Sequence, residues 1–170
     1  MAFIAEDGTG LIDSTSYVTV AYADDYFTYI NYQSSWFEKA TIDRERSLMN
    51  GTQFLDAQYT FIGTKSAQTQ NLEWPRTDAI DNNGFEITNI PKNLKQATCE
   101  AAFKTFAASL YTDTGVKGAV TKEKVDVIEI EYAAGTATTN PYTILDQLLF
   151  SAGLSLGNTG QKTTLKVVRV

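Results

Sequence analysis

The sequence predicts a mainly α-helical fold, a helical bundle of three to four helices with β-strands and extended arms at its periphery. Between Thr19 and Tyr111, three stretches repeat apolar residues at intervals of three and four, the period of a helix packed on one face. Most strand-like segments lie toward the two ends of the chain. A length of 170 residues favours one domain rather than two.

We expect that single domain to fill residues 1–170 and to have three consecutive parts. Residues 1–18 form an extended N-terminal arm, which turns at an Asp-Gly dipeptide that tolerates a positive φ cheaply. Residues 19–111 form the helical core. Residues 112–170 contain an extended strand, a short helix and a C-terminal strand. Because isolated strands are poorly stable, the end strands must pair with one another or with a neighbouring subunit.

Two helices are expected in the first half of the core. The first begins after Thr19, a residue typical of an N-cap, and repeats apolar residues through Ile30. The second runs from about Thr41, its candidate cap, to Tyr59. Gly51 weakens this second helix by roughly 1 kcal/mol relative to alanine, a cost usually accepted where another backbone packs closely.

The third helix has the strongest helical pattern in the sequence. Pro91 suits its first position, and the pattern continues from Lys92 to Tyr111. This helix is apolar on two sides, which is typical of a central helix contacted by several neighbours. A later and shorter helix opens around Pro141 and ends near Gly153.

A long segment without periodicity separates the second and third helices, from Thr64 to Asn89. A loop of this length in a compact domain needs an anchor. Trp74 packed beside Pro75 would supply one, and Arg76 could satisfy buried carbonyl groups or a carboxylate. An exposed recognition loop is the alternative, and we favour the structural loop anchor.

Two strands are expected after the third helix. Val125 to Tyr132 alternates apolar and acidic residues, and Leu165 to Val170 has the pattern of a last strand. Three lysines near the first of these strands form the only concentrated positive patch in the sequence: Lys117, Lys122 and Lys124.

The composition excludes several kinds of enzymatic site. The chain contains no histidine, so it has no Ser-His-Asp triad, no Cys-His pair and no histidine-ligated zinc. Its single cysteine, Cys99, lies in an apolar helical stretch and is expected in the core. For the acidic pairs Asp24-Asp25 and Glu129/Glu131 we expect solvated faces rather than catalysis. We therefore predict no enzymatic activity, cofactor or metal site, and metal-assisted chemistry on carboxylates is the one enzymatic alternative that the composition leaves open.

The charge balance also limits the partners. The 14 basic and 20 acidic residues give a formal net charge of −6. This predicts repulsion from nucleic-acid phosphates unless the basic residues gather on one face. The first residues lack a secretory pattern and no apolar run approaches the length of a membrane span, so we expect a soluble intracellular protein with no membrane partner.

Four tyrosines recur at helical spacing near the start of the core. They could stack nucleic-acid bases, but on an acidic stretch we favour a role in the core or against a partner helix. These residues are Tyr22, Tyr26, Tyr29 and Tyr32.

An ordered series of motifs that spans nearly the whole chain resembles a known family. The series comprises Glu6-Asp7-Gly8-Thr9-Gly10, Ser16-Tyr17-Val18-Thr19-Val20, Ala23-Asp24-Asp25-Tyr26-Phe27, Leu55-Asp56 before an aromatic-Gly exit, Trp74-Pro75-Arg76-Thr77, Ile90-Pro91 and Val125 to Tyr132. It resembles the tailed-phage and prophage family of head-tail connector (adaptor) proteins, often labelled DnaT-like single-stranded-DNA-binding proteins. One departure is Asn50-Gly51-Thr52, where many relatives have an alanine-rich stretch.

The resemblance implies a connector-like structural protein of the virion, made in the host bacterial cytoplasm and located at the head-tail interface. The implied partners are further copies of itself in a ring of twelvefold symmetry, the phage portal protein, and a tail or neck component. DNA would pass through the ring only as transiting cargo. The resemblance implies no enzymatic activity.

The candidate portal or intersubunit contacts lie in the arms and strands. They are Phe3, Ile4, Lys117, Lys122, Lys124, Ile128, Ile130, Tyr132, Val167 and Val170. The alternative function is a single-stranded nucleic-acid-binding module in phage replication or packaging, with the three lysines and exposed tyrosines as its surface. The acidic net charge favours the adaptor over a high-affinity nucleic-acid binder.

Overall fold

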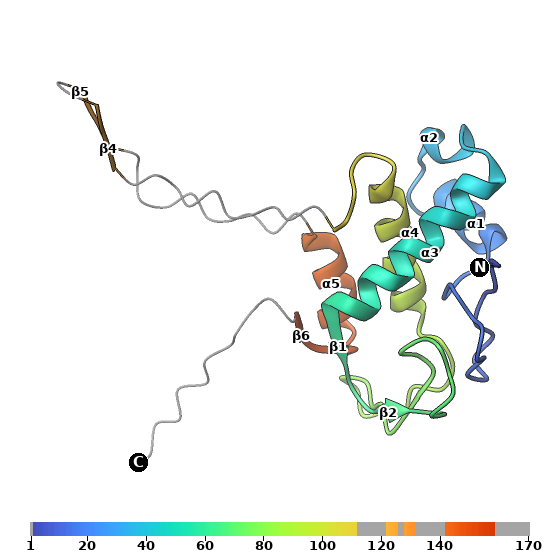
Figure 1. Ribbon diagram of the computed structural model, residues 1–170. Helices are drawn as coiled ribbons and strands as arrows, with labels where there is room; N and C mark the ends of the chain where they lie inside the picture. Colours follow the sequence, from blue (N-terminus) through green and yellow to red (C-terminus); the bar gives the residue numbers. More distant parts are fainter. Residues whose placement is uncertain (1, 112–121, 126–127, 132–141, 159–170) are drawn as a thin grey trace, which may run out of the picture.

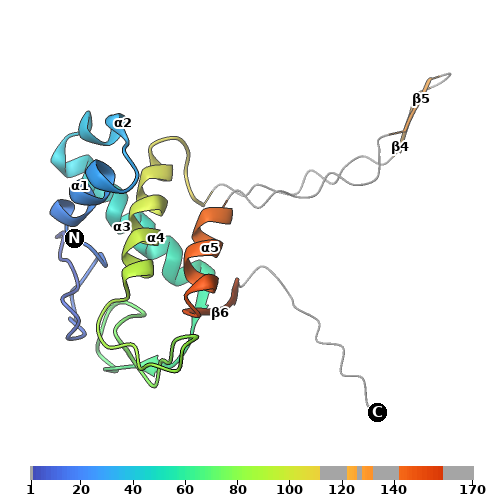
Figure 2. The ribbon, with the colours of Figure 1, turned by 180° about the vertical axis from the view of Figure 1, so that it is seen from behind.

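The body of the protein is a set of packed helices. The structure is a computed structural model, which describes residues 2–111, 122–125, 128–131 and 142–158. Within these residues the chain forms five helices and six short strands, so the fold is mainly α-helical. The two longest helices, α3 (Thr41–Gln58) and α4 (Lys92–Thr105), pack against each other. Figures 1 and 2 show α1 and α2 on one side of this pair and α5 on the other.

The first helix begins where the sequence predicts. Helix α1 spans Val20–Tyr29, and the side chain of Thr19 accepts a hydrogen bond from the backbone N–H of Tyr22 at 3.1 Å. The short helix α2, Ser34–Phe37, follows and buries Trp36 completely. The Trp36 ring contacts the Phe27 ring, with centroids 4.8 Å apart, and this contact fixes α2 on α1.

Both long helices have ends that differ from the prediction. Ala40, not Thr41, is the N-cap of α3, and Tyr59 leaves the helix to begin strand β1 (Tyr59–Phe61). Pro91 is the N-cap of α4 rather than its first helical residue. The α4 helix ends at Thr105 rather than continuing to residue 111, because the chain tightens there into shorter-range turns that bring Phe106 onto Trp36.

Helix α4 is the central helix that its two apolar sides predict. It contacts α1, α3 and α5, and several of its residues are fully buried. On α3, Gly51 faces the α4 backbone. A Cβ at Gly51 would lie 2.8 Å from the backbone nitrogen of Ala102 and 3.1 Å from the carbonyl oxygen of Thr98. The expectation that another backbone packs against Gly51 is therefore confirmed.

This close packing reverses the usual effect of a glycine-to-alanine change in a helix. Alanine is favoured over glycine by roughly 1 kcal/mol in an unobstructed helix. For Gly51→Ala we instead expect a net loss of about 2 kcal/mol of unfolding free energy, since α3 and α4 must move apart. Urea denaturation would measure this loss. The neighbouring exposed change Asn50→Ala is the control and should be neutral or slightly stabilising.

Helix α5, Thr143–Ser151, ends near Gly153 as predicted. Gly153 has a φ of +68°, and the N–H of Leu154 donates to the carbonyl of Leu149 at 2.9 Å, a Schellman ending. Two asparagine side chains from elsewhere satisfy further carbonyls of α5: Asn82 donates to Ser151 at 2.9 Å and Asn93 donates to Leu148 at 3.0 Å.

The strands form small two-stranded pairs instead of one sheet in the described part of the chain. Strand β1 pairs antiparallel with β6 (Ser155–Asn158), which the sequence pattern did not predict, and β2 (Thr64–Lys65) pairs with β3 (Arg76–Thr77). Tyr59 ties β1 to α5, because its hydroxyl donates to Asp146 at 2.6 Å. The β2–β3 pair gives the predicted long loop a local ladder that its sequence does not reveal.

A separate hairpin lies in the segment predicted to be strand-like. It consists of β4 (Lys122–Val125) and β5 (Ile128–Glu131), paired antiparallel. The predicted strand from 125 to 132 is thus corrected to two strands, because Val125 ends the first of them. The predicted C-terminal strand at 165–170 lies outside the described residues. None of the helices within the described ranges is long and apolar enough to cross a membrane.

Candidate nucleic-acid interface

The four tyrosines at helical spacing separate into buried and exposed members. Tyr26 is buried, and Tyr22 is partly buried with the Lys95 ammonium 5.7 Å from the centre of its ring. Tyr29 and Tyr32 are 81% and 71% exposed at the end of α1 and in the turn after it. The favoured core role therefore holds for Tyr26, whereas two rings are left free on the surface.

A buried carboxylate holds in place the segment that carries Tyr29 and Tyr32, which we call the tyrosine surface. Glu100, on α4, accepts hydrogen bonds at its Oε1 from the Tyr26 hydroxyl at 2.6 Å and the Asn31 amide at 2.7 Å. Burial, followed by the bond to Glu100, raises the pKa of Tyr26, so its hydroxyl remains a donor at neutral pH. These bonds join the end of α1 to α4, and thus hold the segment that carries Tyr29 and Tyr32. Sequence reasoning missed Glu100, although a lone acidic residue in an apolar helical pattern is a usable signal.

The acidic pair Asp24-Asp25 does not form a reactive site. Asp24 accepts at Oδ1 from the Trp36 indole N–H at 2.6 Å and from Arg44 at 2.7 Å. Asp25 is exposed and points elsewhere on the helix. Asp24 therefore acts as a structural link among α1, α2 and α3.

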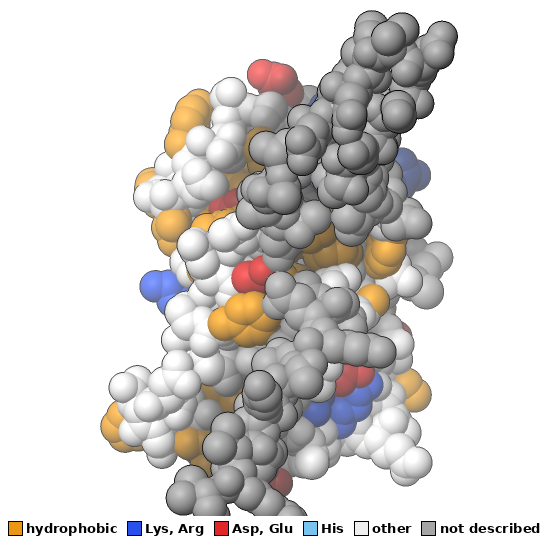
Figure 3. All heavy atoms as spheres, turned by 90° about the vertical axis from the view of Figure 1, so that its left-hand side faces the viewer, with side chains coloured by type: hydrophobic (Ala, Val, Ile, Leu, Met, Phe, Trp, Pro, Cys, Tyr) orange, Lys and Arg blue, Asp and Glu red, His pale blue; other side chains and the backbone are white. Residues whose placement is uncertain are grey.

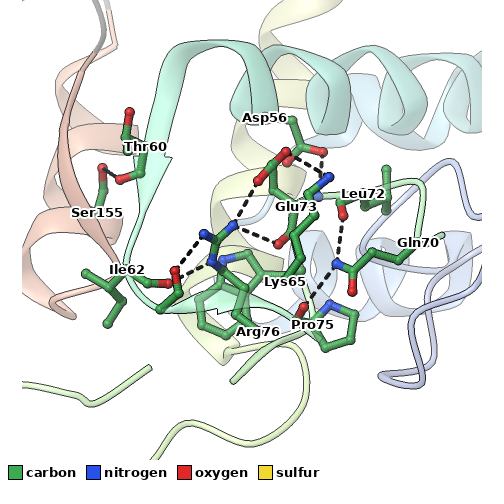
Figure 4. Close-up of polar contacts among 12 residues, drawn as sticks. Asp56, Thr60, Ile62, Lys65, Gln70, Leu72, Glu73, Pro75, Arg76 and Ser155 are labelled. Carbon is green, nitrogen blue, oxygen red and sulfur yellow. Dashed lines mark hydrogen bonds and ion pairs between the residues drawn. The ribbon is translucent and has the colours of Figure 1, made fainter. Parts of the chain in front are cut away.

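The loop residues predicted to act as an anchor lie inside the protein. Trp74 and Pro75 are buried and joined by a cis peptide bond. Arg76 donates from Nε to the Ile62 carbonyl at 2.7 Å and from Nη2 to the Gly63 carbonyl at 2.8 Å (Figure 4). Its Nη1 donates to the Glu73 carbonyl and, at 2.8 Å, to the Glu73 carboxylate. One guanidinium group thus holds both sides of the loop.

A second carboxylate joins the arm, α3 and this loop. Asp56 accepts hydrogen bonds from the Tyr17 hydroxyl and from the backbone N–H of Glu73, the latter at 3.2 Å. Burial raises the pKa of Asp56 to about 7, although both hydrogen bonds favour its charged form. The Tyr17 hydroxyl also accepts a hydrogen bond from the backbone N–H of Trp74 at 3.3 Å. Sequence reasoning quoted Asp56 only as part of a motif and gave it no role.

The remaining predicted contact residues are dispersed. Phe3 packs against the core, and the Ile4 carbonyl accepts from the backbone N–H of Thr15 at 2.7 Å, so the arm folds onto its own chain. Lys122, Lys124, Ile128 and Ile130 lie in the hairpin, with Lys122 opposite Glu131 and Lys124 opposite Glu129 in the register. Lys117, Tyr132, Val167 and Val170 lie outside the described residues.

A cavity of about 380 Å³ lies at the opposite end of α4 from α2. It is lined by Asp81, Asn82, Asn83, Ile87, Pro91, Lys92, Asn93, Ser151, Ala152 and Leu154. Its walls join one loop, the start of α4 and the end of α5. Within the described ranges, no three His, Cys, Asp or Glu residues are grouped so that they could hold a metal ion. Cys99 is buried, and that burial raises the pKa of its thiol, which is unfavourable for a nucleophile.

The net negative charge is concentrated in the first two thirds of the chain. Residues 1–111 contain 14 acidic and 8 basic residues, whereas residues 112–170 contain six of each. Figure 3 views the molecule from the side of α5, away from α1, and the Lys and Arg side chains visible on that face lie at separate places. A tyrosine surface in this acidic part of the chain would bind a nucleic acid through its bases more than through its phosphates.

Comparison with known proteins favours one of the two functions expected from the sequence over the other. No curated protein and no solved structure matches the chain. One family model matches residues 1–170, and its description is "Putative DnaT-like ssDNA binding protein". The prediction of a head-tail adaptor was wrong, because this match points to the alternative, single-stranded DNA binding, and nothing found in the comparisons supports an adaptor. The chain belongs, along its whole length, to the family that this model describes.

Proposed function

We propose that the protein binds single-stranded DNA by stacking bases on Tyr29 and Tyr32. The observation that carries the proposal is the exposure of both rings on a segment fixed through Glu100, combined with the family match. Aromatic rings on a fixed support suit single strands, because every unpaired base has a face that can stack. In a duplex the bases already stack on one another, so the same surface would bind it weakly.

Lys95 is the proposed cationic partner of this surface. Its ammonium group lies over Tyr22, which precedes Tyr29 by seven residues, or about 10 Å along the axis of α1. A single DNA strand that runs along α1 from Tyr29 toward Tyr22 could therefore place one phosphate near Lys95. Basic residues of the remaining chain, among them Lys117, Lys122 and Lys124, could add further phosphate contacts. We propose binding without catalysis, since Asp24, Asp56 and Glu100 each serve structural contacts.

Tyrosine substitutions would test the stacking proposal directly. We expect Tyr29→Ala and Tyr32→Ala each to weaken binding of a fluorescent oligo(dT) by about 1–3 kcal/mol, which is roughly 5- to 150-fold in Kd. Tyr29→Phe keeps the ring and should bind like the wild type. Tyr111→Ala removes another exposed tyrosine, which contacts Phe54 away from α1, and serves as the matched control. Fluorescence anisotropy at low salt measures all five proteins.

The salt dependence of DNA affinity distinguishes the role of Lys95 from that of the tyrosines. Single-strand affinity falls with salt with a logarithmic slope of about −0.7 for each phosphate contact. Lys95→Ala should therefore make the slope shallower by about 0.7, whereas Tyr29→Ala should leave the slope unchanged. The proposal fails if the wild type shows no binding at low salt, or if both tyrosines can be removed without loss of affinity.

A further inference from the structure

The chain contains two Asn-Gly dipeptides in contrasting surroundings. One is Asn50-Gly51 in the middle of α3, and the other is Asn83-Gly84 in the loop before α4. In such a dipeptide the backbone nitrogen of glycine can attack the side-chain amide carbon of asparagine. Glycine favours the reaction because it has no Cβ and reaches the required backbone angles freely. Asparagine is among the residues that limit chemical durability for this reason.

The surroundings of Asn83-Gly84 permit that attack. Both residues are exposed, Gly84 has a φ of +86°, and apart from Gly84 and its two chain neighbours no atom of the described residues lies within 4 Å of the position that a Cβ would take. The Gly84 N–H donates to the Asp81 carbonyl at 3.0 Å, and the Asn83 side-chain amide donates to the Asp81 carboxylate at 3.5 Å; these two bonds must open for the attack. In an exposed turn such an opening costs little free energy.

The surroundings of Asn50-Gly51 prevent it. Gly51 is buried within α3, and the α4 backbone packs against it at Ala102 and Thr98. Its nitrogen lies in the hydrogen-bonded interior of an 18-residue helix. Attack there requires the helix to unfold and to separate from α4, so it requires most of the global unfolding free energy.

We infer that Asn83 is a site of spontaneous deamidation. A bond forms between the Gly84 nitrogen and the Asn83 side-chain carbonyl carbon, the bond from that carbon to the amide nitrogen breaks, and ammonia leaves. Water then opens the cyclic imide at either carbonyl, which yields aspartate or isoaspartate. The net reaction consumes one water and releases one ammonia, with no change of oxidation state.

Deamidation of Asn83 would change the wall of the cavity at the start of α4 and the hydrogen bond from Asn82 to the end of α5. Each product places a new carboxylate beside Asp81, on a loop that lines the cavity at the start of α4. The isoaspartate product also inserts one more carbon into the backbone next to Asn82. Because the Asn82 amide holds the Ser151 carbonyl at the end of α5, the insertion would disturb that contact. The inference is independent of DNA binding.

Incubation of the folded protein at mildly alkaline pH, followed by peptide mass spectrometry, tests the inference. We expect the peptide containing Asn83 to gain the mass of NH2 replaced by OH, at least about a hundredfold faster than the peptide containing Asn50. The same measurement on urea-denatured protein gives the deamidation rates of Asn50 and Asn83 in the unfolded chain. In that state the two rates should be nearly equal. Asn83→Gln should abolish the mass change in its peptide.

Two results would overturn the inference. One is an unmodified Asn83 in the folded protein while the denatured protein reacts. The other is modification of Asn50 and Asn83 at the same rate in the folded state, which would show that the structure gives Asn83 no special reactivity.

Discussion

Replacement of Arg76 by alanine is expected to lower the free energy of unfolding by about 4 kcal/mol. The Arg76 side chain is only 12% exposed, and it donates to three backbone carbonyls and to the Glu73 carboxylate. Removal of the guanidinium leaves the Ile62 and Gly63 carbonyls without this donor, in a place where little water can replace it. Hydrogen bonds from a charged donor are worth more than neutral ones. The loop that ends in β3 should therefore loosen from β1.

Arg76→Lys separates the loss of geometry from the loss of charge. Lysine keeps the positive charge beside Glu73 but cannot present several donors in one plane. We expect it to restore less than half of the lost stability. Urea denaturation followed by tryptophan fluorescence is a direct readout, because Trp74 is the loop's own buried reporter. Arg46→Ala is the control, since that arginine is 68% exposed and should change stability by less than about 0.5 kcal/mol. Equal effects of Arg76→Ala and Arg46→Ala would contradict this account.

The helices of the core could be predicted because their signals are local. A capping threonine at position 19 and apolar residues at intervals of three and four define α1, and Gly153 ends α5. The tight packing at Gly51 was also predictable, because glycine inside a helix indicates a close neighbour. The ends of α3 and α4 were not predictable, since Tyr59 and Phe106 leave their helices for contacts with Asp146 and Trp36. Those partners lie 87 and 70 residues away along the sequence.

The candidate site was only partly predictable for the same reason. Helical spacing identified the four tyrosines but not which of them are buried, because burial depends on α4 and on Glu100. The β1–β6 pair arises from contacts between distant segments, and β6 has a weak strand pattern of its own. The function was mistaken where it rested on what the resemblance implied and on net charge. Overall charge does not describe a small aromatic surface such as that of Tyr29 and Tyr32.

The pH dependence of stability should show the ionisation of Asp56. Burial raises the pKa of Asp56 from 3.8 to about 7, so the folded protein holds this proton more tightly than the unfolded chain does. Its contribution to stability is therefore fully present below about pH 4 and is lost as the pH rises through 7. A pKa raised from 3.8 to about 7 corresponds to a loss of about 4 kcal/mol of unfolding free energy between pH 4 and pH 8. Urea denaturation at several pH values in this interval measures it.

The other groups near Asp56 do not reverse the direction of this effect. The Tyr17 hydroxyl has a pKa raised well above 10 by burial, so it remains a donor throughout the interval. Glu73 raises the pKa of Asp56 and Lys65 lowers it, and those two residues are paired with each other at 3.0 Å. Asp7 and Asp81 have lowered pKa values, so their contributions are lost only as the pH falls below about 4.

Two substitutions assign the pH effect to Asp56. Asp56→Asn cannot ionise, so its stability should change much less between pH 4 and pH 8 than that of the wild type. Tyr17→Phe removes a hydrogen bond that favours the charged carboxylate, and should move the midpoint of the loss to a higher pH. If Asp56→Asn keeps the wild-type slope, another group is responsible. If Tyr17→Phe moves the midpoint downward, the hydroxyl does not stabilise the carboxylate, and the arm, α3 and the loop are not coupled through this proton.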